Sequence, residues 1–291
     1  MKELGGKVAF VTGGASGIGL GQAKVLAEEA RMKVAIADVQ QSKLDEAKAY
    51  FADKDVDVHF LNLDITDRSA FAAARDEVEE VLGPVQLLMN TAGVSMRGPV
   101  EDATYDDWDW HLDVNLNGVI NGVRTFLPRM IELGRGGHIV NTASISAFFA
   151  IPTAALYTTT KFAVRGLSEA LRVELGKYDI GVSCLCPGAV NTNILDAPST
   201  RQSRFGESGF KVDPQIAQRM KALLAAGYDP IELARVTVEG LERNDFWIFP
   251  FPEHIQRIEA GNKELIEAMI PWLDHPDYAV RRAAELAALA G

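Results

Sequence analysis

The stretch VAFVTGGASGIGLGQAKVLAEEA, residues 8–30, decides the fold class. Its apolar start, Val8–Val11, predicts a buried strand, and Gly19–Ala30 has the length and pattern of a helix. Between them, Thr12–Gly19 is rich in glycine, which lets the backbone turn sharply from one element to the next. A strand, a glycine-rich turn and a helix in this order indicate the start of a strand–helix–strand unit, and therefore an α/β fold.

Five more apolar runs continue the alternation. They are Val34–Ala37, Val58–Leu61, Val85–Met89, His138–Thr142 and Gly181–Cys186. The helices expected between the later strands are Ser42–Ala52, Arg68–Leu82, Tyr105–Leu133 and Ala155–Tyr178. Runs that are apolar throughout are typical of strands buried on both faces of a parallel sheet. The sequence therefore predicts a Rossmann-type, doubly wound parallel sheet.

The rhythm changes after the sixth run. Residues 191–226 are polar at first and then helical, which indicates a lid segment, and Phe246–Phe249 predicts a last strand. We expect one catalytic domain over residues 1–252, because no linker interrupts it. Residues 253–291 are expected to form a C-terminal helical extension.

Composition excludes several classes of function. The chain has 291 residues and a net charge of −11, which disfavours binding to nucleic acid or to an anionic membrane. Two cysteines and five scattered histidines predict neither a disulfide framework nor a metal site. The N-terminus lacks the pattern of a signal peptide and no apolar run is long enough to span a membrane, so we expect a cytoplasmic protein.

The glycine-rich turn also predicts a ligand. Such turns let a pyrophosphate approach the backbone and rest on the amides of the following helix, although a plain turn without a ligand gives the same pattern. The residues expected at a dinucleotide are Gly13, Ser16, Gly17, Ile18 and Gly19. Asp38 ends the second strand, 19 residues after Gly19, where a carboxylate can bind an adenosine ribose or simply cap a turn. A carboxylate repels a 2′-phosphate, so we expect NAD rather than NADP.

Ser144, Tyr157 and Lys161 are the candidate catalytic residues. Tyr157 and Lys161 are four residues apart and share one face of a helix. A nearby ammonium favours the phenolate, which would lower the pKa of Tyr157 and make it a usable base. Ser144 follows the fifth strand, where it can bind a substrate oxygen. Taken alone, a Tyr–Lys pair of this spacing is also typical of a solvated helix face.

Together these motifs resemble the classical short-chain dehydrogenase/reductase family over roughly residues 5–250. By resemblance, Tyr157 is the acid/base, Ser144 orients the substrate oxygen, and Lys161 binds the nicotinamide ribose and tunes Tyr157. Asn115 anchors a water in the proton relay. The resemblance also implies cofactor contacts from Asp64 (to adenine), Ile65, Asn90, Ala92, Gly93, Tyr157, Lys161, Pro187, Gly188, Val190 and Thr192 (to the carboxamide). The chain departs from the family at Thr91, where a second Asn is usual.

Two segments are similar to a narrower group, the bacterial Cα-dehydrogenases that oxidise the benzylic alcohol of lignin-type β-aryl ethers. They are residues 104–122 and residues 247–253, followed by the long tail. The resemblance implies an aromatic alcohol as substrate and a ketone as product. Another secondary alcohol or ketone (a steroid, a retinol, a polyol or a ketoacyl group) is the first alternative. The second is a nucleotide-sensing regulator without turnover.

The substrate pocket is expected beside the nicotinamide. Candidate lining residues are Ser95, Phe148, Phe149 and Ile194, although the two phenylalanines could equally be core or subunit-contact residues. The tail carries apolar residues at helical spacing, which must bury against its own domain or against a second subunit. Family members commonly assemble, so we expect a homodimer or a homotetramer.

Overall fold

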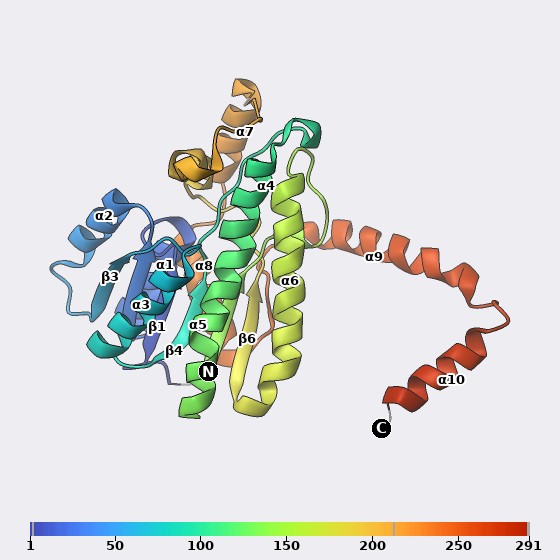
Figure 1. The fold of residues 1–291 in the computed structure, drawn as a ribbon, viewed down its shortest axis with the longest axis horizontal. Coiled ribbons are helices and arrows are strands. Elements are labelled where there is room, and N and C mark those ends of the chain that lie inside the picture. The colour runs from blue at the N-terminus through green and yellow to red at the C-terminus, as the bar shows by residue number, and fades with distance from the viewer. Residues whose placement is uncertain (2, 212, 290–291) are drawn as a thin grey trace. The chain divides into compact units, whose positions relative to one another are not determined.

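The computed structural model describes residues 1, 3–211 and 213–289. The chain folds around a seven-stranded parallel sheet of order β3-β2-β1-β4-β5-β6-β7 (Figure 1). The strands are β1 (Val8–Thr12), β2 (Lys33–Asp38), β3 (Val58–Asn62), β4 (Val85–Asn90), β5 (Gly137–Thr142), β6 (Ile180–Leu185) and β7 (Trp247–Ile248). The predicted doubly wound sheet is confirmed. The order of the strands reverses between β1 and β4, where such sheets bind ligands at their carboxyl ends.

Helices cover both faces of the sheet. The helices of the described chain are α1 (Gly17–Lys24), α2 (Gln41–Phe51), α3 (Arg68–Val81), α4 (Tyr105–Leu112), α5 (Gly118–Leu133), α6 (Ala155–Leu175), α7 (Pro214–Ala225), α8 (Pro230–Arg243) and, in a separate unit, α9 (Ile255–Met269) and α10 (Tyr278–Leu289). Buried side chains of α3, α5 and α6 pack on one face of the sheet, and those of α1, α2 and α8 pack on the other. Both faces of the central strands are therefore buried, as their continuous apolar sequences require.

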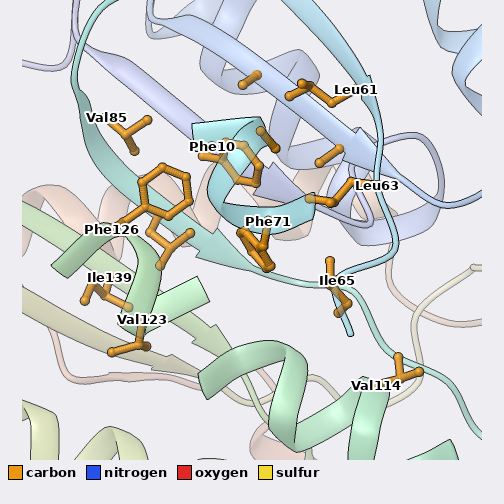
Figure 2. Packing of buried hydrophobic residues seen from close by; sticks show 14 of the residues in the cluster. Phe10, Leu61, Leu63, Ile65, Phe71, Val85, Val114, Val123, Phe126 and Ile139 are labelled. Atoms are coloured by element: carbon orange, nitrogen blue, oxygen red, sulfur yellow. The ribbon is translucent and has the colours of Figure 1, made fainter. Parts of the chain in front are cut away.

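Three aromatic rings fill the core beneath α3 and α5. Phe10 of β1 packs against Phe71 and Phe126, with ring centroids 5.8 and 4.8 Å away, and these two rings are 6.2 Å from each other (Figure 2). All three side chains are almost completely inaccessible to solvent. This packing fixes β1 against the two helices, and so fixes the glycine-rich turn that follows β1.

The expected single helix over Tyr105–Leu133 is wrong in one respect. A π-helical turn, η3 (Asp113–Asn117), separates α4 from α5. The inserted residue shifts the register of the helix and places Asn115 in the interior, where it is completely buried. Apolar periodicity alone does not reveal such a turn, because the residues on both sides of it are equally helical.

His138 gives the core a dependence on pH. Ser183 donates to the Asp245 carbonyl oxygen (2.6 Å) and therefore accepts from His138 Nε2 (2.8 Å), while burial lowers the pKa of His138 to about 3. The unfolded chain protonates this ring near pH 6.5, so stability is lost as the pH falls from about 6.5 towards 3, by about 1.4 kcal/mol per pH unit. We expect urea denaturation at pH 7 and pH 5 to show a smaller loss for His138→Gln than for the wild type.

The matched control for this experiment is the partly exposed His275. We expect His275→Gln to lose as much stability between the two pH values as the wild type does. Equal losses for His138→Gln and the wild type would contradict the assignment.

The chain divides into two compact units, Met1–Phe251 and the smaller Pro252–Gly291. In the smaller unit, α9 and α10 are separated by the short η9 (Ile270–Trp272) and a turn, a stretch that contains Pro271 and Pro276. Both helices carry exposed apolar side chains, among them Leu265 and Leu289. No helix in the described part of the chain has the length and apolar character to cross a membrane.

Candidate active site

A cavity opens at the carboxyl ends of β1, β2 and β4. Its lining includes many residues that the sequence predicts at the cofactor, namely Gly13, Ser16, Gly17, Ile18, Gly19, Asp38, Asp64, Ile65, Ala92, Gly93 and Thr192. These residues come from the loops after four different strands and from the segment after β6. The fold therefore brings the dispersed motifs together around one groove.

The glycine-rich turn has the shape that a diphosphate requires. Gly13 has a φ of +64°, and a Cβ on it would lie 2.8 Å from the Cα of Ala92. A Cβ on Gly19 would collide with the carbonyl oxygen of Gly13. The Ser16 side chain forms no capping hydrogen bond at the start of α1. The N-terminal end of α1 can thus receive a bound anion, so the described residues fit a dinucleotide.

Asp38 is held in place by backbone amides. Its carboxylate accepts hydrogen bonds from the Ala15 amide (3.2 Å) and the Gln40 amide (3.0 Å). Burial raises its pKa, and these amides act in the opposite direction. Val39 and Gln40 follow it on the cavity wall, and neither can neutralise a phosphate. The arrangement favours a free ribose 2′-hydroxyl.

Asp38→Ala is expected to narrow the preference for NAD over NADP by about 100-fold, because the variant loses hydrogen bonds to the ribose and the charge that repels a 2′-phosphate. The measurement is kcat/KM for each cofactor with one alcohol. Asp45→Ala on the exposed side of α2 is the control, and it should keep the wild-type ratio. An unchanged ratio for Asp38→Ala would refute the role of Asp38.

Ser144, Tyr157 and Lys161 lie together, as the sequence predicts. The Ser144 hydroxyl is a hydrogen-bond partner of Tyr157, and the Lys161 Nζ lies 5.4 Å from the centroid of the Tyr157 ring. Lys161 is buried, and its Nζ donates to the Thr142 carbonyl oxygen (2.9 Å). Burial lowers the pKa of Lys161 to about 8. Lys161 is therefore still charged at neutral pH, and its hydrogen bond to Thr142 fixes the position of the ammonium.

Lys161 is expected to lower the pKa of Tyr157, but in the protein by itself this pKa is raised. Burial raises the pKa of Tyr157, and the Ser144 hydrogen bond and the nearby Arg97 guanidinium only partly oppose it. The reason is that desolvation of the phenolate outweighs these favourable contacts. The positive charge that lowers the pKa of Tyr157 comes from Arg97, a residue that the sequence motifs did not indicate.

Asn115 and Thr91 form hydrogen bonds that fix the loop after β4. The Asn115 side chain accepts from the Val94 amide (2.8 Å), and donates to the Val94 carbonyl oxygen (2.9 Å) and to Thr160 Oγ1 (3.2 Å). Thr91, the departure from the family pattern, donates to Gln22 Oε1 (2.6 Å). Its hydroxyl therefore ties the loop after β4 to α1.

Other predicted cofactor residues lie elsewhere. Within the described chain, the cavity lining does not include Asn90, Tyr157, Lys161, Pro187, Gly188 or Val190. Asn90 donates to Asn141 Oδ1 (2.9 Å) between β4 and β5, which is a structural position. Pro187 accepts the Ile145 amide (2.9 Å), and a Cβ on Gly188 would meet the Phe251 ring. Their roles toward a cofactor stay predictions.

The predicted substrate residues are dispersed. Phe148 lies against Phe249 (ring centroids 5.1 Å apart) and Trp247 (5.4 Å). The Arg165 guanidinium lies 4.5 Å from the centroid of the Phe148 ring. These contacts favour the packing alternative. Ile194 lines the cofactor cavity, Ser95 is buried, and Phe149 is partly buried. Their contact with substrate stays a prediction.

The sequence motifs missed several residues of the site. Arg97 lies near Tyr157, and its Nε is buried without a hydrogen-bond partner among the described residues. The missed residues of the cavity wall are Val39, Gln40, Leu63, Thr91, Val94, Trp110, Val114, Asn193, Asp196, Ala197, Thr200 and Gln202. Val39, Gln40 and Leu63 are sequence neighbours of predicted residues, and Trp110 and Val114 reach the cavity from α4 and η3.

The chain is similar to known dehydrogenases. A family model for short chain dehydrogenases matches residues 7–203. A C alpha-dehydrogenase of Sphingobium sp. (strain NBRC 103272 / SYK-6) is 41% identical over 289 residues, covering 99% of this chain and 94% of that protein. The apo structure of LigO from strain SYK-6 has a TM-score of 0.84 at 54% identity, covering 99% and 97% of the two chains.

A third likeness concerns the cofactor groove. A short chain dehydrogenase/reductase from Burkholderia phymatum, solved in complex with NAD, has a TM-score of 0.85 at 29% identity and covers 95% of this chain and 98% of its own. The family match spans well over half of the chain and contains the glycine-rich turn, Ser144, Tyr157 and Lys161. The chain belongs to the short chain dehydrogenase family.

Proposed function

We propose that this protein oxidises a benzylic secondary alcohol to a ketone with NAD, and that its substrate is the Cα hydroxyl of a lignin-derived aryl-glycerol β-aryl ether. The reaction type rests on the Tyr157 hydroxyl, placed against Ser144 with Lys161 on the same helix face. The substrate class rests on the similarity to a C alpha-dehydrogenase over 99% of the chain.

The residues divide the work of proton transfer. When bound, oxidised NAD supplies the hydride acceptor and a positive charge beside the site. Ser144 hydrogen-bonds the substrate oxygen, and the Tyr157 phenolate removes the hydroxyl proton. The Lys161 ammonium, held by Thr142, binds the cofactor ribose, and together with the charge of bound NAD it offsets the burial that raises the pKa of Tyr157 in the protein alone. Tyr157 is partly buried, which limits the access of water to the proton that moves.

The proposal also covers the localisation, the oligomeric state and the partners of the protein. We infer a cytoplasmic homodimer or homotetramer that binds a small aromatic alcohol and neither nucleic acid nor membrane. The net charge of −11 supports the last two points, and the exposed apolar residues of α9 and α10 support assembly. A monomeric mass in sedimentation equilibrium would refute the assembly.

A spectrophotometric screen with NAD and NADP tests the activity. The alcohols are a β-aryl ether model dimer, 1-phenylethanol, a steroid alcohol and 2-propanol. We expect NADH to form fastest from the model dimer. Turnover of another alcohol alone would keep the reaction type and reject the substrate. Binding of NAD without turnover of any alcohol would favour a nucleotide-sensing regulator.

A further inference from the structure

We propose that Gln202, in the segment after β6, binds the adenine end of the dinucleotide by accepting a hydrogen bond from the exocyclic amino group, and that this contact closes the segment over the cofactor. The lid is the part of the predicted lid segment 191–226 that precedes α7, namely residues 191–211. The proposal rests on the NAD-dependence proposed above and adds a residue of the lid to the recognition of adenine.

The order of the strands shows which end of the cavity receives adenine. Asp38 ends β2, where it is placed for the adenosine ribose, and Asp64 follows β3, the edge strand beyond β2. Tyr157 lies on α6, which follows β5 on the opposite side of β1 and β4. The adenine therefore belongs at the β3 side of the groove, and the reacting ring belongs at the β5 side.

The lid crosses this groove from end to end. It starts after β6, and its first short helix, η6 (Ile194–Thr200), contributes residues to the cavity wall. Gln202 then reaches the β3 side, where its Nε2 donates to Asp64 Oδ2 (3.1 Å). Arg204 donates to Thr66 Oγ1 (2.5 Å) in the same loop. The lid thus contacts two residues of the loop after β3, Asp64 and Thr66, although this loop is far from the lid in sequence.

The Gln202 amide has one atom left to bind. Its Oε1 is buried and accepts no hydrogen bond from the described residues. Rotating the amide would bring Oε1 against the Asp64 carboxylate, so repulsion holds Nε2 in that place and leaves Oε1 as the unsatisfied acceptor. A buried acceptor without a donor is unfavourable, which makes this position receptive to an N–H group.

The adenine amino group matches this pair of acceptors. It carries two N–H bonds, and Asp64 and Gln202, which are hydrogen-bonded to each other and both line the cavity, carry a carboxylate and an amide oxygen as acceptors. A hypoxanthine base carries a carbonyl at the same position and donates to neither. Recognition of adenine would then hold the lid against the loop after β3, which it already contacts at Asp64 and Thr66, independently of the nicotinamide and of the alcohol.

Binding measurements test the recognition. Calorimetry gives the dissociation constants of NAD and of nicotinamide hypoxanthine dinucleotide for the wild type, Gln202→Met and the exposed control Gln218→Met. We expect Gln202→Met to lose about fivefold to tenfold of the wild-type preference for NAD, as the loss of one hydrogen bond predicts. Gln218→Met should keep the full preference. An unchanged preference in Gln202→Met overturns the proposal.

Limited proteolysis tests the closure. Trypsin can cut the lid at Arg201, Arg204 and Lys211. ADP-ribose, which lacks nicotinamide, should slow these cuts in the wild type and in Gln218→Met but not in Gln202→Met. Protection by NAD with none by ADP-ribose would overturn the closure. Neither experiment uses an alcohol, so both results can be interpreted even if the proposed oxidation fails. Absence of NAD binding would reject the proposal that NAD is the cofactor.

Discussion

Tyr157→Phe is expected to lower kcat for alcohol oxidation by about 10³-fold, because removal of the hydroxyl leaves no general base beside Ser144. The ring itself is retained, so its packing over Lys161 should persist. The measurement is the steady-state rate of NADH formation with the alcohol that the screen identifies, together with the dissociation constant of NAD. That constant should change by less than about threefold, since the cavity lining of the described chain does not include Tyr157.

Tyr178→Phe is the matched control for this experiment. Tyr178 is exposed, at the end of the segment after α6, and its hydroxyl is remote from the cavity. Its removal should leave kcat unchanged. An activity of Tyr157→Phe equal to that of the wild type would reject Tyr157 as the base and favour the alternative in which the fold binds a nucleotide without catalysis.

Asp107→Asn is expected to release the lid. Asp107 is completely buried, and its Oδ1 accepts from the Arg201 guanidinium at 2.6 Å. Its Oδ2 accepts from the Gly209 amide (3.1 Å) and from the Thr104 amide (2.9 Å). Hydrogen bonds and the Arg201 charge hold the pKa of Asp107 at about 2 although burial opposes them. One carboxylate thus ties α4 to two separate points of the lid.

Loss of this charge leaves Arg201 buried without a counterion. The guanidinium is 8% exposed and lies 5.3 Å from the Trp110 ring. Breaking a buried ion pair at one partner costs about 3–5 kcal/mol, so trypsin cleavage of the lid should accelerate by about 100-fold or more. We expect the KM for NAD to rise as well, because the lid forms part of the cavity wall.

A double variant separates the pair from its surroundings. Asp107→Asn combined with Arg201→Met should be cleaved more slowly than Asp107→Asn alone, because no unpaired charge remains. Asp109→Asn, on the exposed side of α4, is the control and should be cleaved at the wild-type rate. A wild-type cleavage rate for Asp107→Asn would contradict the proposed anchoring of the lid.

The elements of the sheet and the residues of the glycine-rich turn could be predicted because their signals are local. The run Val8–Val11 is followed within eight residues by the turn that a helix N-terminus requires, and the structure places β1 and α1 there. Tyr157 and Lys161 are equally local, since a spacing of four places both on one face of any helix. Ser144 is identified from its place after the fifth strand, whereas Asn115, in another element, comes from the resemblance to a family.

Positions that depend on long loops could not be predicted. Phe148 follows Ser144 by four residues, yet it packs against Trp247 and Phe249 of a strand that lies about a hundred residues further along the chain. Arg97 reaches Tyr157 from the loop after β4, and its sequence neighbours form no recognisable motif. The π-helical turn at Asp113–Asn117 likewise has no signature in the apolar pattern.

The sequence by itself determined the α/β class, the parallel sheet, the dinucleotide turn and the Tyr157–Lys161 pair, because each depends on residues within a few turns of one element. The tertiary structure alone decided where the lid lies. Its contacts join Arg201 to Asp107 and Gln202 to Asp64, residues 94 and 138 positions apart. Such pairs form only in the folded sheet, because the carboxyl ends of its parallel strands lie at one edge and the segment after β6 crosses that edge to the loop after β3.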